Sequence, residues 1–395
     1  MKGLLPKNSF HRFTVIVAGS VMVGLAISVF IVLSWMKLQK KLQTSEGERV
    51  MLQAQIASVS GELTKLKSDD QYLKNKKLEG DIGQIETTYS QTVSTYEDLL
   101  QLKENEKNTS SFDSAFANIL TLLSDRSYAT ATADLQKLRG DIAGEEQKIA
   151  SSFTIPVNAT ASNSPPTNGF SQQSVTTDIG TFLVDLVAGE LSSTRVIVDT
   201  ASDGTCTNNC PVMSLGDYAA RSGAYAGVNG GYFCPPEYPS CAGKTNSFDT
   251  LLMNKNKVYF NSDNNKFSVV PAVIFGSGFI RFVGQSLEWG RDTSIDSMIA
   301  NQPLVLSGGN SNFNGNSDPK MSSKSTRGFV ANKGNTVYIG MIYDASVSDM
   351  GHVLKTLGMD NGLNLDDGGS AALWFSGYKV GPGRNLPNAI LFVRK

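Results

Sequence analysis

The stretch "GLNLDDGGSAALWF", Gly362 to Phe375, places two adjacent carboxylates and two glycines between apolar runs. The letters before the carboxylates predict a strand that enters a turn at Asp366 and Asp367. Gly368 and Gly369 accept backbone angles and close approaches that other residues forbid. An Asp-Gly hairpin turn with no further role is the alternative. The spacing of oxygen ligands excludes an EF-hand loop, so the pattern favours carboxylates presented at a sheet edge.

Short apolar segments surround this turn from about Val175 to Lys395 and alternate with turns rich in Gly, Asn, Asp and Ser. Segments such as "TRVIVDT", "TVYIGMIYD" and "AILFVRK" have the composition of strands. One helix is expected in "SVSDMGHVLKTLGM", with its cap at Ser346 or Ser348. We therefore expect residues 175–395 to form an α+β domain made mostly of antiparallel sheet.

The first half of the chain has a different pattern, because no proline occurs between Pro6 and Pro156. A stretch without proline favours long helices. Apolar residues then recur at alternating spacings of four and three, which predicts a coiled-coil stalk over 37–107 and a homo-oligomer built through it. These residues are Leu52, Ile56, Val59, Leu63 and Leu66, and then Leu78, Ile82, Ile85 and Tyr89 after an interruption at "KSDDQYLKNKK". The alternative is an amphipathic helix that folds back on its own chain. A second helical region is expected at 111–152.

Residues 153–174 have a third composition. "TIPVNATASNSPPTNGFSQQS" is nearly uncharged and rich in Pro, Ser, Thr and Asn, which is typical of a flexible linker.

Residues 13–35 carry no charge and as a helix would span roughly 35 Å, more than the ~30 Å hydrocarbon core of a bilayer. The stretch predicts a transmembrane signal anchor after a short cytoplasmic tail at 1–12. A cleaved signal peptide is the alternative, because Lys2, Lys7 and Arg12 precede the apolar run.

Four cysteines occur close together, at Cys206, Cys210, Cys234 and Cys241. An even number beside a membrane anchor predicts disulfides in an oxidising compartment, with local pairing of 206 to 210 and of 234 to 241 favoured among three connectivities. A zinc site is the alternative, although the spacing is not that of zinc ribbons. We therefore expect a single-pass membrane protein whose C-terminal domain is extracytoplasmic.

The chemistry that these residues permit is limited. A net charge of −1 gives no reason to expect nucleic acid. The chain has two histidines, His11 and His352, which removes most Ser-His-Asp and histidine-rich metal schemes. Paired cysteines disfavour a thiolate nucleophile. Carboxylates, arginine, amides and hydroxyls remain.

Two further stretches supply such groups. "GAYAGVNGGYF", Gly223 to Phe233, runs apolar residues into Asn-Gly-Gly and then aromatics, so that Asn229 could present its amide beside exposed backbone. "SSKSTRGFVA", from Ser322, places Arg327 at the entry of a strand, where a guanidinium can bind a phosphate or carboxylate with two donors. A simple Asn-Gly turn and a solvated arginine are the respective alternatives.

Taken together and in this order, these stretches resemble the phosphodiester glycosidase family over roughly Val175 to Lys395. The matching elements are "VNGGYF" at 228–233, "QPLVLSGG" at 302–309, "STRGFVA" at 325–331, "NLDDGGSAAL" at 364–373 and "RNLPNAILFV" at 384–393. The chain departs from the family at two places: Asp367 stands where the family has glycine, and Asp344-Ala345-Ser346 stands where the family commonly has Asp-Gly-Arg.

The resemblance implies hydrolysis of a sugar-1-phosphodiester, in a cell-surface glycan or glycopolymer. On this hypothesis Asp366 is the base or nucleophile at the anomeric carbon, Arg327 neutralises the phosphate, and Asn229 positions the substrate. Residues expected to bind substrate are Gly230, Gly231, Tyr232, Asn364, Asp367, Gly368, Gly369 and Ser370, and Phe233 and Trp374 are candidates for stacking on a sugar.

No cofactor is expected, although Asp366, Asp367 and Asn364 offer oxygen ligands for a divalent cation that the sequence leaves unassigned. The competing function is a non-catalytic carbohydrate-binding or envelope-assembly protein on the same fold.

Overall fold

The computed structural model describes residues 9–106, 108–263, 269–316 and 318–395. The chain divides into two compact units, Met1–Ile85 and Glu86–Lys395. The second unit holds a group of helices and all of the described strands.

The first unit is helical, as expected, but its helices are not a coiled coil. Helix α1 covers Ser9–Lys67, and helix α2, Asp70–Asn105, begins within the predicted interruption. The apolar residues with coiled-coil spacing lie exposed on these helices, for example Leu52 at 58% and Ile56 at 65%. The prediction of a coiled-coil stalk at 37–107 is therefore wrong. The spacing produces an apolar face on a helix, but a coiled coil also needs a second helix that packs against this face.

The predicted membrane span at 13–35 is also contradicted. In the part of the chain that the structure describes, no helix combines the length and the apolar character that crossing a bilayer requires. The side chains of residues 9–21 and 23 lie outside the described residues. The predicted single-pass topology is contradicted together with the span. Of the predicted tail at 1–12, residues 1–8 lie outside the described residues.

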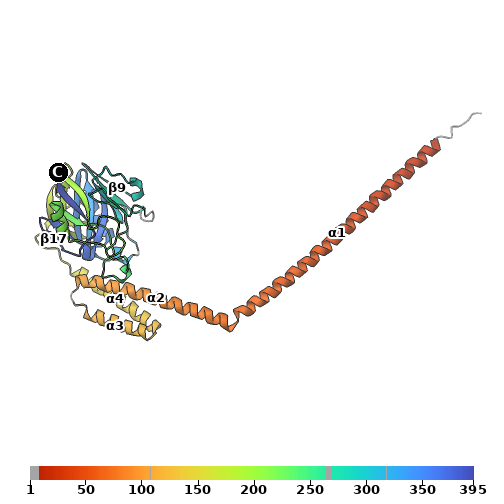
Figure 1. Ribbon diagram of the computed structural model, residues 1–395, viewed down its shortest axis with the longest axis horizontal. Helices are drawn as coiled ribbons and strands as arrows, with labels where there is room; N and C mark the ends of the chain where they lie inside the picture. Colours follow the sequence, from red (N-terminus) through yellow and green to blue (C-terminus); the bar gives the residue numbers. More distant parts are fainter. Residues whose placement is uncertain (1–8, 107, 264–268, 317) are drawn as a thin grey trace, which may run out of the picture. The chain divides into compact units, whose positions relative to one another are not determined.

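Three helices pack together at the start of the second unit. The part of α2 from Glu86 onward lies beside α3, Ser110–Ser124, and α4, Tyr128–Ser152 (Figure 1). Their buried side chains form a core of their own, which comprises Leu99, Leu102, Phe116, Ile119, Leu123, Ala131, Leu135, Leu138 and Ile142. This part of α2 therefore follows the alternative in which the helix packs against its own chain.

The described strands form three sheets, and their pairing is antiparallel except between β1 and β2. This confirms the α+β, mostly antiparallel prediction. The eight-stranded sheet has the order β1 (Thr160–Ala161), β2 (Gly169–Thr176), β3 (Thr181–Glu190), β14 (Thr336–Ala345), β13 (Ser325–Lys333), β15 (Asn361–Asp367), β11 (Leu304–Ser307) and β12 (Asn310–Ser311). Strand β2 thus includes part of the expected linker.

Two five-stranded sheets complete the domain. The first has the order β17 (Tyr378–Val380), β16 (Leu373–Phe375), β5 (Ala226–Asn229), β18 (Asn388–Arg394) and β4 (Thr194–Thr200). The second has the order β7 (Tyr259–Phe260), β6 (Leu252–Met253), β10 (Ser297–Ala300), β8 (Ala272–Gly276) and β9 (Phe279–Val283).

The main core lies between the large sheet and the two smaller sheets. It joins Val330 of β13 and Leu363 of β15 to Val228 of β5, Ile390 of β18 and Phe275 of β8. Helix α7, Val347–Thr356, covers the other face of the large sheet, and helix α5, Leu215–Ser222, packs on the sheet that contains β5. Strand β15 therefore lies between the core shared with the two smaller sheets and the layer formed by α7.

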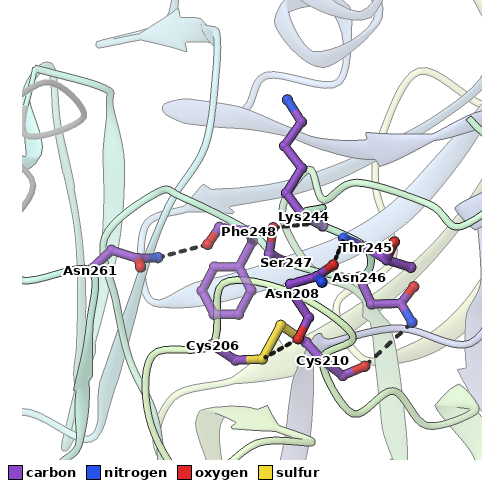
Figure 2. Close-up of a disulfide and its surroundings, with 9 residues drawn as sticks. All are labelled: Cys206, Asn208, Cys210, Lys244, Thr245, Asn246, Ser247, Phe248 and Asn261. Atoms are coloured by element: carbon purple, nitrogen blue, oxygen red, sulfur yellow. Dashed lines mark hydrogen bonds between the residues drawn. A yellow bond between two sulfur atoms is a disulfide. The ribbon is translucent and has the colours of Figure 1, made fainter. Parts of the chain in front are cut away.

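Both predicted disulfides are present. Cys206 pairs with Cys210, and Cys234 pairs with Cys241. Figure 2 shows the first loop beside residues 244–248, where the Thr245 backbone N–H donates to Asn208 Oδ1 at 2.9 Å. The Asn246 amide donates to the Cys210 carbonyl at 3.3 Å. The two disulfide loops are thus connected through one short segment.

Helix α7 begins at one of the two predicted caps. Ser346 Oγ accepts from the Asp349 backbone N–H at 3.1 Å, and the Asp349 carboxylate accepts from the Ser346 backbone N–H at 2.9 Å. This reciprocal pair satisfies two backbone donors that the helix itself leaves free.

We predict that Ser346→Ala lowers the free energy of unfolding by about 1 kcal/mol, the usual cost of losing a helix cap. Urea denaturation of the full chain measures the change. Ser348→Ala on the same helix is the control and should have a smaller effect. Equal losses from both substitutions would show that the cap does not contribute.

Candidate active site

The two aspartates of the opening stretch lie at the end of β15, where the chain leaves the large sheet. Strand β15 pairs with β13 on one side and β11 on the other, and the register aligns Arg327 with Asp367. The chain then turns through a short 3-10 helix, Gly368–Ser370, in which Gly368 has φ +58°. Glycine adopts this angle at little cost, so the turn brings both carboxylates to one cavity.

A cavity of about 300 Å³ opens at this turn, near the lower end of the range for ligand pockets. Its lining combines charged, aromatic and backbone groups. The carboxylates are Glu104, Asp318, Asp366 and Asp367, the cations are Lys320 and Arg384, the aromatic residues are Tyr232, Phe233 and Tyr238, and the turn contributes Gly368, Gly369 and Ser370. The second disulfide, Cys234–Cys241, forms part of the rim.

Asp366 is a strongly perturbed carboxyl in this cavity. It is 9% exposed, and burial, followed by repulsion from Asp367, raises its pKa to about 8. A hydrogen bond from Ser370 and the charge of Arg384 oppose this rise. The Asp366 side chain is therefore mostly protonated at neutral pH, and small changes in its surroundings alter its charge.

Asp367 is held by the arginine that the sequence placed at the site. Arg327 is fully buried, and its guanidinium donates to the Asp367 carboxylate, to the Ser323 carbonyl at 2.6 Å and to the Ala345 carbonyl at 3.0 Å. Burial raises the pKa of Asp367 in spite of this cation. Arg327 does not line the cavity, so in the structure it positions a carboxylate that does.

Asn229 lies behind the cavity wall. It is fully buried, its amide donates to the Asp366 carbonyl at 2.8 Å, and its side-chain oxygen accepts from the Ala372 backbone N–H at 3.1 Å. The Asp366 backbone N–H in turn donates to the Gly230 carbonyl at 3.0 Å. Asn229 therefore connects the smaller sheet to both ends of the aspartate turn.

The two glycines after Asn229 are closely packed, and Gly230 has no room for a side chain. A Cβ at Gly230 would lie 1.8 Å from Asn388 Oδ1, which also accepts from the Gly231 backbone N–H at 3.0 Å. Neither glycine lines the cavity. Their place in the structure explains the Asn-Gly-Gly motif through close packing.

Tyr232 lines the cavity. The Asn364 amide donates to that hydroxyl at 2.5 Å and to the Gln302 carbonyl at 3.0 Å. Burial raises the pKa of Tyr232 well above its ordinary value, so the phenol is neutral and can donate a proton to a hydrogen bond. Asn364 thus orients Tyr232, and Trp374 lies away from the cavity with its ring against Tyr378.

The structure also brings in residues that the sequence analysis did not select, namely Glu104, Tyr238, Asp318, Lys320 and Arg384. Arg384 stands at the start of the "RNLPNAILFV" element, which was a usable signal. Glu104 comes from a helix that offered no chemical pattern. A divalent cation at Asp366, Asp367 and Asn364 stays a prediction, and the described residues contain no group of three or more His, Cys, Asp or Glu side chains placed to hold a metal.

The raised pKa of Asp366 predicts how stability depends on pH. Because the folded pKa of about 8 lies above the unfolded value of 3.8, the folded state binds more protons between these values, and stability falls as the pH rises from about 4 to 8. We predict that Asp366→Asn removes this slope and stabilises the chain at pH 7 by up to roughly 4 kcal/mol. Asp141→Asn, at an exposed position on α4, is the matched control.

Urea denaturation at pH 5, 7 and 8 measures this difference. A gain from Asp366→Asn that is the same at every pH would contradict a raised pKa, since it would have to come from packing alone.

Comparison with known proteins finds one family model that matches the residues around this site. Residues 222–393 match the family model described as phosphodiester glycosidase, a range that contains Asn229, Arg327, Asp366 and Arg384. No curated protein matches the chain.

Three solved structures are similar to the chain at low sequence identity. One is the zebrafish N-acetylglucosamine-1-phosphodiester α-N-acetylglucosaminidase catalytic domain, described as auto-inhibited by its pro-peptide, with 16% identity, a TM-score of 0.46 and coverage of 60% of this chain and 87% of that one. Another is a hypothetical protein from Synechocystis, with 13% identity, a TM-score of 0.41 and coverage of 57% and 62%. A third is a putative exported protein from Burkholderia pseudomallei, with 10% identity, a TM-score of 0.35 and coverage of 54% and 74%.

The family match falls on the domain that carries the aspartate turn and its cavity. Residues 222–393 are thus similar to the phosphodiester glycosidase family, and this similarity indicates a hydrolase that acts on phosphodiester-linked glycosides.

Proposed function

We propose that this chain hydrolyses the bond between a sugar C1 and a phosphodiester oxygen in a cell-surface glycan or glycopolymer, with Asp366 as the reacting carboxyl. The observation that carries the proposal is the Asp366 carboxyl in the cavity, with its pKa raised to about 8 beside a glycine turn. Perturbed carboxyls in a cavity are typical of catalytic sites.

The reaction places modest demands on the protein. Water adds to C1, the bond between C1 and the phosphate oxygen breaks, and its electron pair leaves with the phosphate. The products are the free sugar, a phosphate monoester and a proton. A phosphate monoester is a far better leaving group than an alkoxide, so the reaction needs less acid catalysis than ordinary glycoside hydrolysis.

Ionised Asp366 supplies either the base for the attacking water or the nucleophile at C1 in this proposal. Its raised pKa makes it a stronger base than an ordinary aspartate. Ser370 stabilises the ionised form by a hydrogen bond. Asp367, fixed by Arg327, keeps the pKa of Asp366 high by repulsion.

The rest of the cavity supplies groups that can bind a sugar. The neutral Tyr232 hydroxyl is a hydrogen-bond donor, the Gly368–Ser370 turn exposes backbone, and Phe233 and Tyr238 present aromatic rings. Asn229, Gly230, Gly231 and Asn364 act in this proposal by positioning Asp366 and Tyr232.

We predict that Asp366→Ala abolishes release of N-acetylglucosamine from a synthetic N-acetylglucosaminyl phosphodiester, lowering kcat at least about a thousandfold, because no other group replaces the ionised carboxyl. The full chain is assayed for sugar release, with Asp141→Ala as the control. A variant that keeps the parental rate would remove Asp366 from the reaction.

A panel of methyl phosphodiesters of other sugars tests whether the enzyme acts on a sugar other than N-acetylglucosamine. Absence of release from the whole panel would favour the alternative function, a non-catalytic carbohydrate-binding protein on this fold. An assay with and without EDTA tests the divalent cation.

The pH profile provides a second prediction. If Asp366 acts in its ionised form, kcat/KM rises about tenfold per pH unit below its pKa and levels off above about 8. Initial rates between pH 5 and 9 measure the profile. A rate that falls with rising pH would instead assign Asp366 as the acid.

A further inference from the structure

One face of α2 covers the cavity. Glu97, Gln101 and Glu104 follow one another at spacings of four and three, which places them on the same side of a helix. Gln101 and Glu104 line the cavity. Glu97 reaches the rim, where its carboxylate accepts from the Ser240 backbone N–H at 3.0 Å. All of these residues belong to the unit Glu86–Lys395.

The Glu104 carboxylate rests on the glycine turn. Its oxygens lie 2.5 and 2.7 Å from the position that a Cβ would occupy on Gly369. It forms an ion pair with Arg384 and accepts a hydrogen bond from the Gly369 backbone. Burial raises the pKa of Glu104, and the Arg384 charge and this hydrogen bond oppose the rise. Both side chains of the pair are 19% exposed. An anion is thus held by a guanidinium and a backbone N–H, two groups that also bind phosphate oxygens.

While α2 covers the cavity, an incoming anion finds few free positive groups in the lining. In the described lining of the cavity, both cations form ion pairs with carboxylates of α2. Lys320 Nζ lies 3.8 Å from the Glu97 carboxylate, and Arg384 pairs with Glu104. Arg327 directs its donors to Asp367 and to two backbone carbonyls. A phosphodiester would therefore meet four carboxyl groups and no unpaired cation.

We propose that Arg384 and the backbone N–H of Gly369 form the subsite for the phosphate group of the substrate, and that Glu104 occupies this subsite until α2 is displaced. The inference rests on the proposed function, since it identifies where the phosphate of that substrate binds. Arg384 takes the role that the sequence assigned to Arg327, and Glu104 makes the free chain self-inhibited.

The position of Arg384 suits the reaction. Arg384 and Asp366 line the same cavity, and the charge of Arg384 lowers the pKa of Asp366. The Arg384 backbone N–H donates to the Gly369 carbonyl at 2.8 Å, and the guanidinium lies 5.4 Å from the centre of the Tyr238 ring. A phosphate on Arg384 would therefore lie beside the turn that carries Asp366, where its leaving oxygen gains negative charge.

Binding of dimethyl phosphate tests the subsite, because this anion has the charge of the substrate and no sugar. The full chain carries Asp366→Asn in every sample and is titrated by calorimetry. Glu104→Gln should tighten binding roughly tenfold. This is the change expected if the fraction of molecules with an open phosphate subsite rises from about a tenth to nearly one. Glu145→Gln, at a surface pair with Lys148 on α4, is the matched control and should change nothing.

Arg384→Gln should remove binding in the Glu104→Gln background, and Arg384→Lys should restore part of it by returning the charge. Folding of each variant is verified by its melting temperature. Parental affinity in Glu104→Gln, or full affinity in Arg384→Gln, would overturn the proposal.

Hydrogen exchange tests the movement of α2. Amides of residues 97–105 should exchange faster at saturating dimethyl phosphate, and unchanged protection would show that the anion binds without displacing the helix. The proposed hydrolysis is judged separately. If Asp366→Ala loses turnover but Arg384→Gln binds dimethyl phosphate with parental affinity, only the proposed phosphate subsite is contradicted. If anion binding depends on Arg384 but no variant hydrolyses the substrate, only the proposed hydrolysis is contradicted.

Discussion

The cost of burying two adjacent carboxylates at the end of β15 governs the arrangement of the site. A buried carboxylate without compensation is expensive, and the protein compensates Asp366 and Asp367 in different ways. Asp367 receives the guanidinium of Arg327, whereas Asp366 has a raised pKa and gives up its charge near neutral pH. The same arrangement ties the sheets together, because Arg327 also binds the end of β14 at Ala345 and Asn229 reaches the turn from β5. Fold and chemistry therefore depend on the same few contacts.

Local patterns in the sequence were sufficient for much of the domain. Short apolar segments between turns predicted antiparallel sheet, and the "SVSDM" pattern placed a helix cap at one of two serines. The glycines after Asp367 predicted a turn that presents carboxylates, because the reason is local: Gly368 adopts a positive φ. In each of these cases the deciding atoms lie within a few residues of one another.

Features that depend on distant partners were not predictable in the same way. The apolar spacing at Leu52 to Leu66 is that of a coiled coil, but spacing alone does not provide a second helix. The sequence brought Arg327 to the site and could not show that its donors are used by Asp367 and two carbonyls. Glu104 and Arg384 are 280 residues apart, and the sequence around either residue does not indicate that the two side chains pair. Burial and charge pairing of this kind appear only in the folded chain.

The second disulfide adds a consequence for how the cavity is assembled. Cys234 and Cys241 are seven residues apart, and Cys206 and Cys210 are four apart. Closing such short loops costs little chain entropy compared with joining one pair to the other. Random encounters in the unfolded chain therefore favour the native pairing before any sheet exists. The disulfide at the rim of the cavity can therefore form without the strands that bring Asp366 to it.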